Sequence, residues 1–527
     1  MLQPYQPMVF SEFDLQVFRD FVPQDHYLRK AKAVVDFERF RETCEDAYVH
    51  KTMGRPAIDA ILMLKILFLR FHYRLSDRQV VVRSGSDIAF RFFLDLPAGR
   101  QLPNHTTSTY FRQRLGEERF ERIFQELVGQ AREHGLVHDR LRLKDATHVL
   151  GDVADLRPLE RVAQVRDRLL DAAEDFFAAW AMAQREALDT LRQSTAELAD
   201  DERLAHRLAH LRAMTAAVEE RVATLPAPTT LPDRARDRLA DAVTLARKLL
   251  GDHDHPHAGD RLVNPADPDA RTGKHGQFYV GYSLDVAIDA DSELITAINV
   301  LPANGAEAAD ALVLIEQEES AQGNDVQALS IDGAGYNGPV LRALSDPEGL
   351  NLDVTVPVPQ TPPSTKFGPE RFALTVVDAV AVLECPAGQT TTAREKVEEG
   401  FKYRFAPTHC ANCPLRGACL QKPERPTGRT VIKNEHQAEY DKANAKTTTA
   451  AYAETRRQHP RIERKLADLT RNHGARRAVY RGLGKVRIQA FLTAMVVNVK
   501  RMIRLIRPST DSLPAAPFGI AVRAEPG

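Results

Sequence analysis

Three acidic residues stand where carboxylates could hold divalent metal ions. Asp145 lies in a short apolar stretch predicted to be a strand, Asp332 follows the apolar run Val326–Ile331, and Glu463 lies among apolar residues at helical spacing. Magnesium prefers oxygen ligands and is held in proteins by a few carboxylates on rigid elements. Two such ions, about 3.5–4 Å apart, neutralise the crowded charge of phosphoryl transfer. The acids therefore predict metal-assisted chemistry at phosphodiester bonds.

Each acid also has an ordinary structural alternative. Alternation places Asp145 on the same strand face as Leu141 and Leu143, where a charge requires a partner or a metal, although a strand-end Asp can also face water. Asp332 begins a Gly-rich turn at the carboxyl end of a strand, where ligand sites gather, and Asp-Gly is also plain turn chemistry. Glu463 is expected beside the apolar stripe of its helix, towards the core, and a Glu–Arg helix surface is its alternative.

The surroundings of Glu463 are strongly basic. The chain of 527 residues has a formal net charge of −1, yet the stretch from Arg456 to Arg507 contains 15 Lys or Arg residues and two acids. This concentration predicts a surface that binds DNA phosphates, with a solvated basic face as the alternative. The candidate DNA-binding residues in this stretch are Arg457, Arg461, Arg464, Lys465 and Arg471.

A helical domain is predicted over residues 10–135. Within it, a helix beginning at Ser76-Asp77-Arg78-Gln79, a turn near residues 84–87 and a helix beginning at residues 104–109 resemble a helix-turn-helix arrangement. The last of these helices carries Arg112 and Arg114, which are candidate DNA contacts. A helical hairpin that never touches DNA is the alternative.

A mixed α/β core is predicted over residues 138–155 and 260–355. Strands are expected near residues 140–150, 278–288, 294–301 and 325–331, with a helix at about 306–321. Strand, long insertion, strand hairpin, helix and strand is a plan used by RNase H-like folds. The insertion, residues 156–255, is predicted to be a structural or oligomerising helical hairpin. Helices of the core resume over residues 435–507, and residues 508–527 are expected to form a loose tail.

A cysteine-bearing insertion is predicted over residues 356–430. It holds Cys385, Cys410, Cys413 and Cys419, and Cys410-Ala-Asn-Cys413 is a typical half of a tetrahedral zinc site. Cys413 and Cys419 are spaced more widely than a standard second pair, so His409 is an alternative ligand and reduced, partly buried thiols are the alternative to zinc.

Composition is that of a globular protein, with 43% hydrophobic and 27% charged residues. No secretory signal and no apolar run long enough for a bilayer is found, so no membrane association is expected. Five cysteines in a chain without an export signal argue against a disulfide framework and favour the cytoplasm.

The motifs together resemble bacterial DDE-type insertion-sequence transposases. They are Asp145-Ala-Thr-His-Val, Asp332-Gly-Ala-Gly-Tyr-Asn-Gly, Asp267-Pro-Asp-Ala-Arg271 with Gly281-Tyr282, and Arg461-Ile-Glu463 followed by Asn498-Val-Lys500-Arg501. The resemblance covers most of residues 10–507, including Gly54-Arg55-Pro56 and Pro103-Asn104-His105-Thr106-Thr107 in the N-terminal domain.

This resemblance implies an RNase H-like catalytic domain with Mg²⁺ or Mn²⁺ as cofactor. It implies that Asp145, Asp332 and Glu463 are the metal-binding triad, and that Tyr336 and the basic residues near Glu463 position DNA. Family members often have a Tyr and an Arg before the Glu and a Lys after it, whereas His459 and Thr470 occupy such spacings here. Arg457, Arg461 and Arg471 are candidate substitutes for those residues.

The function expected from the resemblance is transposition of an insertion sequence. Hydrolysis of a phosphodiester at the element end would free a 3′-hydroxyl that attacks target DNA. The expected partners are double-stranded DNA, as terminal inverted repeats and as target, and a second copy of the chain, since two ends must be joined. The expected location is the cytoplasm, at the nucleoid. A catalytically inactive, domesticated transposase that only binds DNA and a nuclease of the same fold are the alternatives.

Overall fold

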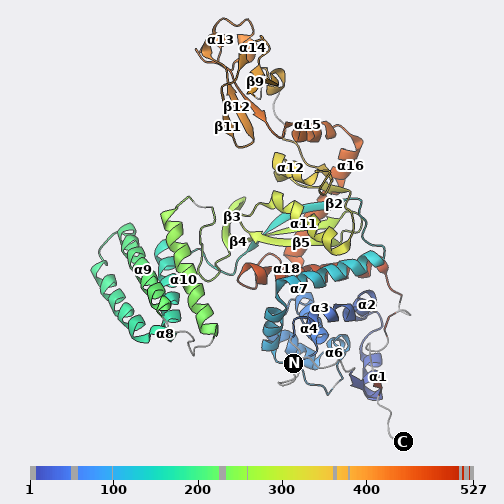
Figure 1. Cartoon of the computed structure of the whole chain (residues 1–527). Coiled ribbons are helices and arrows are strands. Elements are labelled where there is room, and N and C mark those ends of the chain that lie inside the picture. The colour runs from blue at the N-terminus through green and yellow to red at the C-terminus, as the bar shows by residue number, and fades with distance from the viewer. Residues whose placement is uncertain are drawn as a thin grey trace.

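A mixed β-sheet lies at the centre of the molecule, between a helical N-terminal region and a set of peripheral insertions (Figure 1). The computed structural model describes residues 8–48, 57–97, 99–224, 233–257, 259–359, 365–377, 380–509, 513–514 and 521–522. The motif Gly54-Arg55-Pro56 lies outside these residues. Within them, none of the helices combines the length and the apolar character needed to cross a membrane.

The N-terminal region is helical, as predicted. Ser76 caps α5 in a capping box with Gln79, and the Asn104 side chain accepts from Thr106 N–H at the start of α7. The apolar helix α4 is buried along nearly its whole length. The helices of this region are α1 (Glu12–Phe21), α2 (Tyr27–Val34), η1 (Phe37–Phe40), α3 (Arg41–Glu45), α4 (Ala60–His72), α5 (Asp77–Ser86), α6 (Ile88–Phe93) and α7 (His105–Glu133).

The central sheet is mixed and has β2 (Arg142–Leu150) in its middle. On one side β2 pairs antiparallel with the long strand β4 (Gln277–Asp289), and on the other it pairs in parallel with β6 (Ala328–Ser330). Three further strands complete the sheet: β3 (Arg271–His275) and β5 (Ile295–Pro302) pair with β4, and β7 (Asp353–Thr355) pairs in parallel with β6. Two helices, α11 (Glu307–Gln322) and α12 (Gly338–Leu344), form the crossovers between strands.

The two faces of the sheet pack against different helices. Leu143 and Val149 of β2 belong to the large apolar core that also contains residues of α7, α17 (Pro460–Asn472) and α18 (Leu483–Ile506). The opposite face meets α11, where Ala287 of β4 packs against Leu314. Because successive strand residues point to opposite faces, the odd-numbered residues of β2 face α17 and α18.

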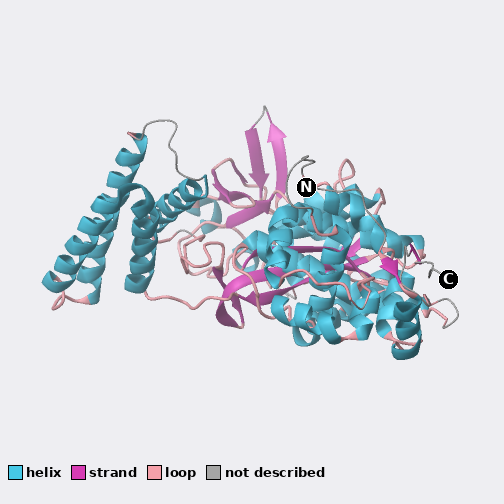
Figure 2. Cartoon of the chain, turned by 90° about the horizontal axis from the view of Figure 1, so that it is seen from below, coloured by secondary structure: helices cyan, strands magenta, loops and turns pink. Residues whose placement is uncertain are grey.

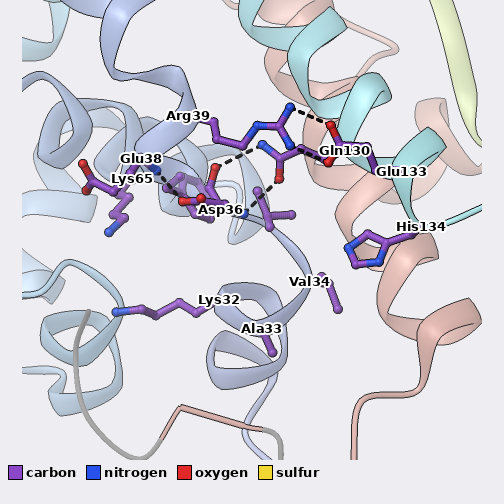
Figure 3. Close-up of a pocket in the computed structure, with 12 residues that line it drawn as sticks. Lys32, Ala33, Val34, Asp36, Glu38, Arg39, Lys65, Gln130, Glu133 and His134 are labelled. Atoms are coloured by element: carbon purple, nitrogen blue, oxygen red, sulfur yellow. Dashed lines mark hydrogen bonds and ion pairs between the residues drawn. The ribbon is translucent and has the colours of Figure 1, made fainter. Parts of the chain in front are cut away.

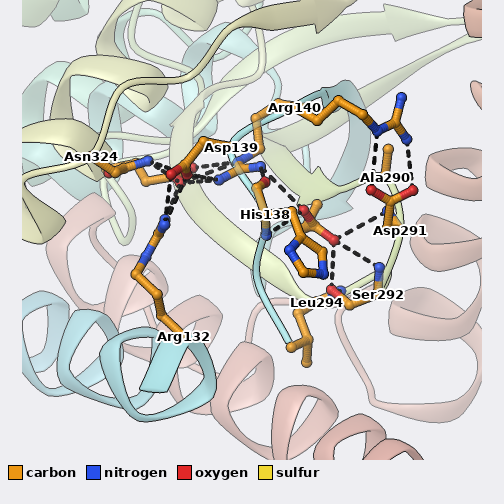
Figure 4. A network of polar contacts seen from close by, with 12 residues as sticks. Arg132, His138, Asp139, Arg140, Ala290, Asp291, Ser292, Leu294 and Asn324 are labelled. Atoms are coloured by element: carbon orange, nitrogen blue, oxygen red, sulfur yellow. Dashed lines mark hydrogen bonds and ion pairs between the residues drawn. The ribbon is translucent and has the colours of Figure 1, made fainter. Parts of the chain in front are cut away.

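A buried polar network fixes the start of β2 (Figure 4). The fully buried Arg142 guanidinium donates to the buried Glu318 carboxylate of α11 at 2.5 Å and to Asp289 at 3.3 Å. Asp289 also accepts from Ser292 N–H at 2.7 Å, which closes the turn between β4 and β5 that the sequence predicts. A buried charge is tolerated only with such partners, so this network holds β2, α11 and the turn in one arrangement.

The insertion after β2 corrects a prediction, because its described residues form three helices and not a hairpin. They are α8 (Pro158–Ser194), α9 (Asp200–Ala223) and α10 (Asp233–Asp254), which project together to one side (Figures 1 and 2). Turn residues 195–199 end α8, so the first helical run divides in two. Leu169, Leu211 and Ala246, one from each helix, are fully buried in a shared core. The apolar faces of the three helices therefore cover one another, whereas a hairpin of two helices would leave an apolar face exposed.

The cysteine-bearing segment is a small β-rich unit with its own core. Phe372, Leu383, Tyr403 and Val431 are buried together. Its elements form two three-stranded sheets and short helices: η3 (Pro369–Arg371), β8 (Ala373–Val377), β9 (Val380–Glu384), β10 (Thr390–Thr391), β11 (Arg394–Val397), β12 (Gly400–Arg404), α13 (Pro407–Ala411), α14 (Arg416–Cys419) and β13 (Thr430–Asn434).

The C-terminal helices return the chain to the sheet through α15 (Gln437–Lys446) and α16 (Ala450–Gln458) before α17 and α18. The prediction of a loose tail after residue 507 is wrong for the described part of that tail. Leu513 is buried, and the Pro514 carbonyl accepts from the buried Arg29 guanidinium at 2.6 Å. Strand β14 (Ala521–Val522) pairs in parallel with β1 (Val9–Phe10). The described residues of the tail thus contact the N-terminal region, where β1 offers a strand edge and Arg29 a buried cation.

Candidate metal and nucleic-acid site

Asp145 lies in the middle of β2, on the face that α17 covers. It pairs with Val286 of β4, and its neighbours on the same face, Leu143 and Thr147, are buried. The Asp145 side chain is half-buried and accepts a hydrogen bond from the Ala146 N–H at 2.8 Å. The sequence expectation that Asp145 shares a face with apolar neighbours matches this position.

Asp332 lies beside Asp145 across the parallel strand pair. The last pair between β2 and β6 is Leu143 with Ser330, and each acid stands two residues after its member of that pair, Asp145 within β2 and Asp332 just past the end of β6. Neighbouring strands are about 5 Å apart, so the two carboxylates emerge together where the strands separate. Asp332 is half-buried and starts η2 (Gly333–Gly335). A Cβ on Gly335 would lie 2.0 Å from the Ile331 side chain, so this tight turn after the acid requires glycine.

Glu463 lies on the first turn of α17, the helix that packs on β2. The helix buries Ile462, Leu466 and Leu469, whereas Glu463 is exposed at the edge of that stripe. The expectation that Glu463 points towards the core is therefore wrong, because its position on the helix is about 100° from Ile462.

The start of α17 is tied to the strand that carries Asp332. The buried His459 Nδ1 lies 3.0 Å from the Ser330 hydroxyl, and the Arg456 guanidinium donates to the Ile331 carbonyl at 3.0 Å. Burial and the nearby Arg456 lower the pKa of His459 to about 4, so this ring is neutral at physiological pH. The sequence marked His459 only as a departure from the family pattern, and its contact with Ser330 was missed because it joins residues far apart in the chain.

The three acids influence one another electrostatically. Burial raises the pKa of Asp145 to about 6, and the negative charges of Asp332 and Glu463 act in the same direction. The Ala146 N–H and Lys144 act in the opposite direction. Lys144 itself points to the other face, where it forms a buried ion pair with Asp285 at 2.8 Å. No ion pair within the described residues neutralises Asp145, Asp332 or Glu463.

These observations bear on whether a metal fits. Among the described side chains, no three His, Cys, Asp or Glu residues lie close enough together to hold a metal ion as they stand. The donor set is nevertheless all oxygen, and a half-buried carboxylate whose pKa is raised by burial and, to a smaller extent, by two like charges gains from a cation. By the chemistry of their oxygen donors, the residues present therefore fit a hard divalent cation.

The predicted DNA-binding residues are dispersed. Arg464 and Arg471 are exposed on α17, and Arg457 is exposed on α16 and paired with Glu454. Arg461 donates to the Ala290 carbonyl, and Lys465 is buried.

The remaining candidate DNA contacts, Tyr336, Arg112 and Arg114, also differ in how exposed they are. Tyr336 is half-buried and its ring lies 4.8 Å from that of Tyr440. Arg114 is exposed, whereas Arg112 is buried and pairs with Asp77 at 2.7 Å. Arginine and lysine residues that look alike in the sequence thus fall into two groups. Some are exposed to solvent, and others are buried or bonded to groups within the protein.

The four cysteines of the β-rich unit come from separate loops and are all free thiols. Cys385 follows β9, Cys410 lies on α13, Cys413 follows it, and Cys419 ends α14. Burial raises the pKa of Cys419, and the neighbouring Cys410, Cys385 and Cys413 add to that shift. The fold therefore brings the four predicted sulfurs near one another, but among the described residues they do not form a group that could hold a metal ion as they stand.

Asp267 has a structural position that the sequence did not reveal. Its buried carboxylate accepts from the Tyr282 hydroxyl at 2.6 Å and from the Gly482 N–H at 2.9 Å, and Asp269 accepts from Leu483 N–H at 2.8 Å. The Asp267-Pro-Asp269 motif thus holds the N-terminus of α18 against β4.

A cavity of about 530 Å³ in the N-terminal region lies apart from the acids (Figure 3). Two of its lining residues, Lys32 and Lys65, both pair with Asp95, and Arg39 bridges to Glu133 at 2.6 Å. None of the lining residues is a predicted site residue.

Comparison with protein families gave two matches, one at each end of the chain. Residues 16–114 match a transposase domain family of otherwise undefined function, and residues 384–503 match a transposase DDE domain. The second match contains Glu463 and the four cysteines, whereas Asp145 and Asp332 lie between the two. Comparisons with curated proteins and with solved structures gave no match. The two family matches bear out the resemblance to DDE-type insertion-sequence transposases: the chain carries a transposase domain near its N-terminus and a transposase DDE domain towards its C-terminus.

Proposed function

We propose that this transposase cleaves DNA at the ends of an insertion sequence and joins the freed ends to target DNA, with Asp145, Asp332 and Glu463 as its metal-binding acids. The observation that supports the proposal is that Asp145 on β2 and Asp332, just past the end of β6, each stand two residues after the last pair of these parallel strands, near the helix that bears Glu463. Strand order β5-β4-β2-β6-β7, with only the last two pairings parallel, supports an RNase H-like core.

The acids, the helix α17 and its arginines would have different roles in the reaction. Mg²⁺ or Mn²⁺, when bound, would neutralise charge on the scissile phosphate and on the attacking and leaving oxygens. Asp145 and Asp332 offer carboxylates from a rigid sheet. Glu463 approaches from a helix anchored by His459 and Arg456. The exposed Arg464 and Arg471 on the same helix would bind DNA phosphates.

The domain assignment extends the same proposal. The N-terminal helices 10–135 would bind DNA, the core 138–155 and 260–355 with the helices 435–507 would carry out catalysis, and the insertion 156–255 would serve structure or assembly. A dimer or larger assembly in the cytoplasm, at the nucleoid, is proposed because two element ends must be joined.

The cysteine unit, residues 356–430, is proposed to hold a structural Zn²⁺ through Cys385, Cys410, Cys413 and Cys419. The proximity of Cys385, Cys410 and Cys413 to Cys419 supports it, because such a small core gains most from a cross-link of this kind, and binding would require the sulfurs to move closer together than they stand. Metal analysis of the purified chain tests this point.

A strand-transfer assay with Mg²⁺ tests the main proposal. The variants Asp145→Asn, Asp332→Asn and Glu463→Gln are expected to lose at least about 100-fold in cleavage and joining, because each removes a negative metal ligand while keeping side-chain size. DNA binding should persist in all three. The matched control is Asp237→Asn, which changes an exposed acid on α10 and should leave activity unchanged.

Normal joining by Asp145→Asn or Asp332→Asn protein would overturn the acid assignment. Binding without cleavage by the unaltered chain would instead favour the inactive, DNA-binding alternative. Cleaved ends that are never joined would favour a nuclease.

A further inference from the structure

Basic side chains gather where α17 and α18 meet the N-terminal helices. Helix α18 packs on α2 and α4 of that region (Figure 1). The chain leaves α17 close to the turn after α4, because a Cβ on Gly474 would lie 3.6 Å from the Arg74 Nε. We call this group of cations the basic seam, and it consists of Arg74, Lys465, Lys500 and Arg504.

The cations of the seam lie close enough together to affect one another. Burial lowers the pKa of His473 to about 4, and the charges of Lys500, Lys465 and Arg74 act in the same direction. Burial also lowers the pKa of Lys500, and Arg504 adds to that shift. The seam is therefore a region of positive potential.

The cations of the seam lack acidic partners. None of the four side chains forms an ion pair or a hydrogen bond with another residue that the structure describes. Two acids, Asp468 and Glu293, act on these charges, but each has another partner. Asp468 accepts from the Asn472 amide at 2.7 Å, and Glu293 lies 3.7 Å from Arg501. An anion from outside the chain could therefore pair with the seam.

Lys465 is the least exposed cation of the seam. Only 8% of this residue is exposed, and burial lowers the pKa of its ammonium. Its Nζ nevertheless keeps some contact with solvent, as the end of a long side chain at the edge of a buried stripe can. A buried ammonium without a hydrogen-bond acceptor costs stability, and a bound anion would offset that cost.

The other three cations form an accessible rim in front of Lys465. Arg74 and Arg504 are exposed, and Lys500 is half-buried. A ligand that approaches from solvent would meet the rim first, with the charge of Lys465 behind it.

An exposed surface connects the seam with the candidate catalytic acids. Glu463 and Lys465 are about 200° apart around α17 and so lie at opposite edges of its buried stripe. The outer face of the helix between these edges carries Arg464 and Arg471, which are both exposed. A polyanion held at Glu463 can therefore reach the seam across the solvent side of α17 without entering the core.

We propose that the basic seam binds the phosphate backbone of duplex DNA and so ties the N-terminal helices and the catalytic core to one duplex. Lys and Arg side chains that stand on separate elements and lack carboxylate partners are suited to DNA phosphates. This inference rests on the proposed function, because the duplex is taken to be the one that reaches the acids.

The salt dependence of DNA binding tests the inference with the full-length chain. The probe is a duplex of about 30 base pairs without divalent ions, so that binding is measured in the absence of cleavage. Lys500→Gln and Lys465→Met should each lower the affinity about fivefold and reduce the slope of log affinity against log salt by about 0.9. Lys500→Arg keeps the charge and should keep both values. The matched control is Lys422→Gln, which changes an exposed lysine of the cysteine unit.

Thermal unfolding without DNA separates binding from folding. Lys465→Met removes a buried, unpaired charge and should raise the midpoint of unfolding by at least about 1 °C while it weakens DNA binding. A lysine that only supports the fold would show the reverse, with a lower midpoint and an unchanged salt slope.

An unchanged affinity and slope in both Lys500→Gln and Lys465→Met would overturn the inference and leave the proposed function standing. A changed oligomeric state with DNA binding intact would also overturn it and would identify the seam as a contact with an acidic surface of a second copy. Stabilisation of the chain by inorganic phosphate, with no effect of the variants on DNA binding, would identify a site for a small anion instead. If the unaltered chain did not bind the duplex, the proposed function itself would fail.

Discussion

At neutral pH the Asp145 carboxylate stands half-buried on β2, close to two other acids and without an ion-pair partner among the described residues. Its pKa of about 6 lies above the ordinary value because burial and like charges both oppose ionisation. The folded protein therefore tolerates a charge that costs stability and that a bound cation would offset. Such a cost at one residue is common where chemistry, and not packing, sets the residue type.

Asp145→Asn should stabilise the protein in a pH-dependent way. The folded-state pKa of Asp145 exceeds its unfolded value, so the folded state binds more protons between about pH 4 and 6, and the carboxyl's contribution to stability falls as pH rises through that window. We expect the variant and the unaltered chain to be equally stable near pH 4, and the variant to be more stable by about 2 kcal/mol at pH 7.

Urea unfolding in buffer without divalent ions measures this difference. Asp237→Asn is the surface control and should show no such trend. A stability difference that does not change between pH 4 and pH 7 would contradict the electrostatic account of Asp145.

At the level of single residues, the sequence predicted the face on which Asp145 lies, because strand alternation is a local property. It did not predict that Asp332 would lie beside Asp145, since the register of two strands nearly 190 positions apart is set by the whole sheet. It misjudged Glu463, which stands on the exposed edge of its helix. The burial of Arg112 could not be predicted from the sequence either, because its ion-pair partner Asp77 comes from another helix.

The helix α17 depends on a polar anchor for its position over the sheet. His459 precedes the helix and contacts Ser330, which is two residues before Asp332. Glu463 lies one helical turn after His459, so the anchor sets how closely this third acid approaches the other two.

His459→Ala should slow DNA cleavage more than it weakens DNA binding. Loss of the contact leaves the buried Ser330 hydroxyl with only the long hydrogen bond from Arg456 at 3.4 Å, which should cost about 1 kcal/mol of stability. A double-mutant cycle with Ser330→Ala should give a coupling energy of about 1 kcal/mol. Because the pKa of His459 is about 4, its replacement should not alter the pH dependence of cleavage between pH 5 and 8.

Single-turnover cleavage at saturating DNA measures the effect, with His253→Ala on the exposed end of α10 as the control. Additive stability losses in the cycle, together with an unchanged cleavage rate, would show that the anchor has no positioning role.

Among the elements, those with strong local signals were predicted well. The helix starts at Ser76 and Asn104 and the turn at Asp289–Ser292 follow from capping and turn chemistry. The division of the insertion into three helices and the packing of the tail were not predicted. Both depend on which apolar faces meet in three dimensions, and helical periodicity alone does not contain that information.

In the whole molecule, the matched family regions lie at the two ends and the first two acids lie between them. The core gathers these parts by placing the late helices α17 and α18 on the strands that carry Asp145 and Asp332. The candidate site therefore depends on contacts between segments more than 100 residues apart, and the insertion and the cysteine unit lie at the periphery (Figure 1).

The most direct test of this account is an anomalous-diffraction measurement on crystals of the full chain soaked in Mn²⁺. We expect manganese peaks within about 2.5 Å of carboxylate oxygens of Asp145 and Asp332, with Glu463 at one of them, and their loss in Asp145→Asn crystals. Manganese bound elsewhere, with no peak between Asp145 and Asp332, would contradict the assignment of these acids as the metal site.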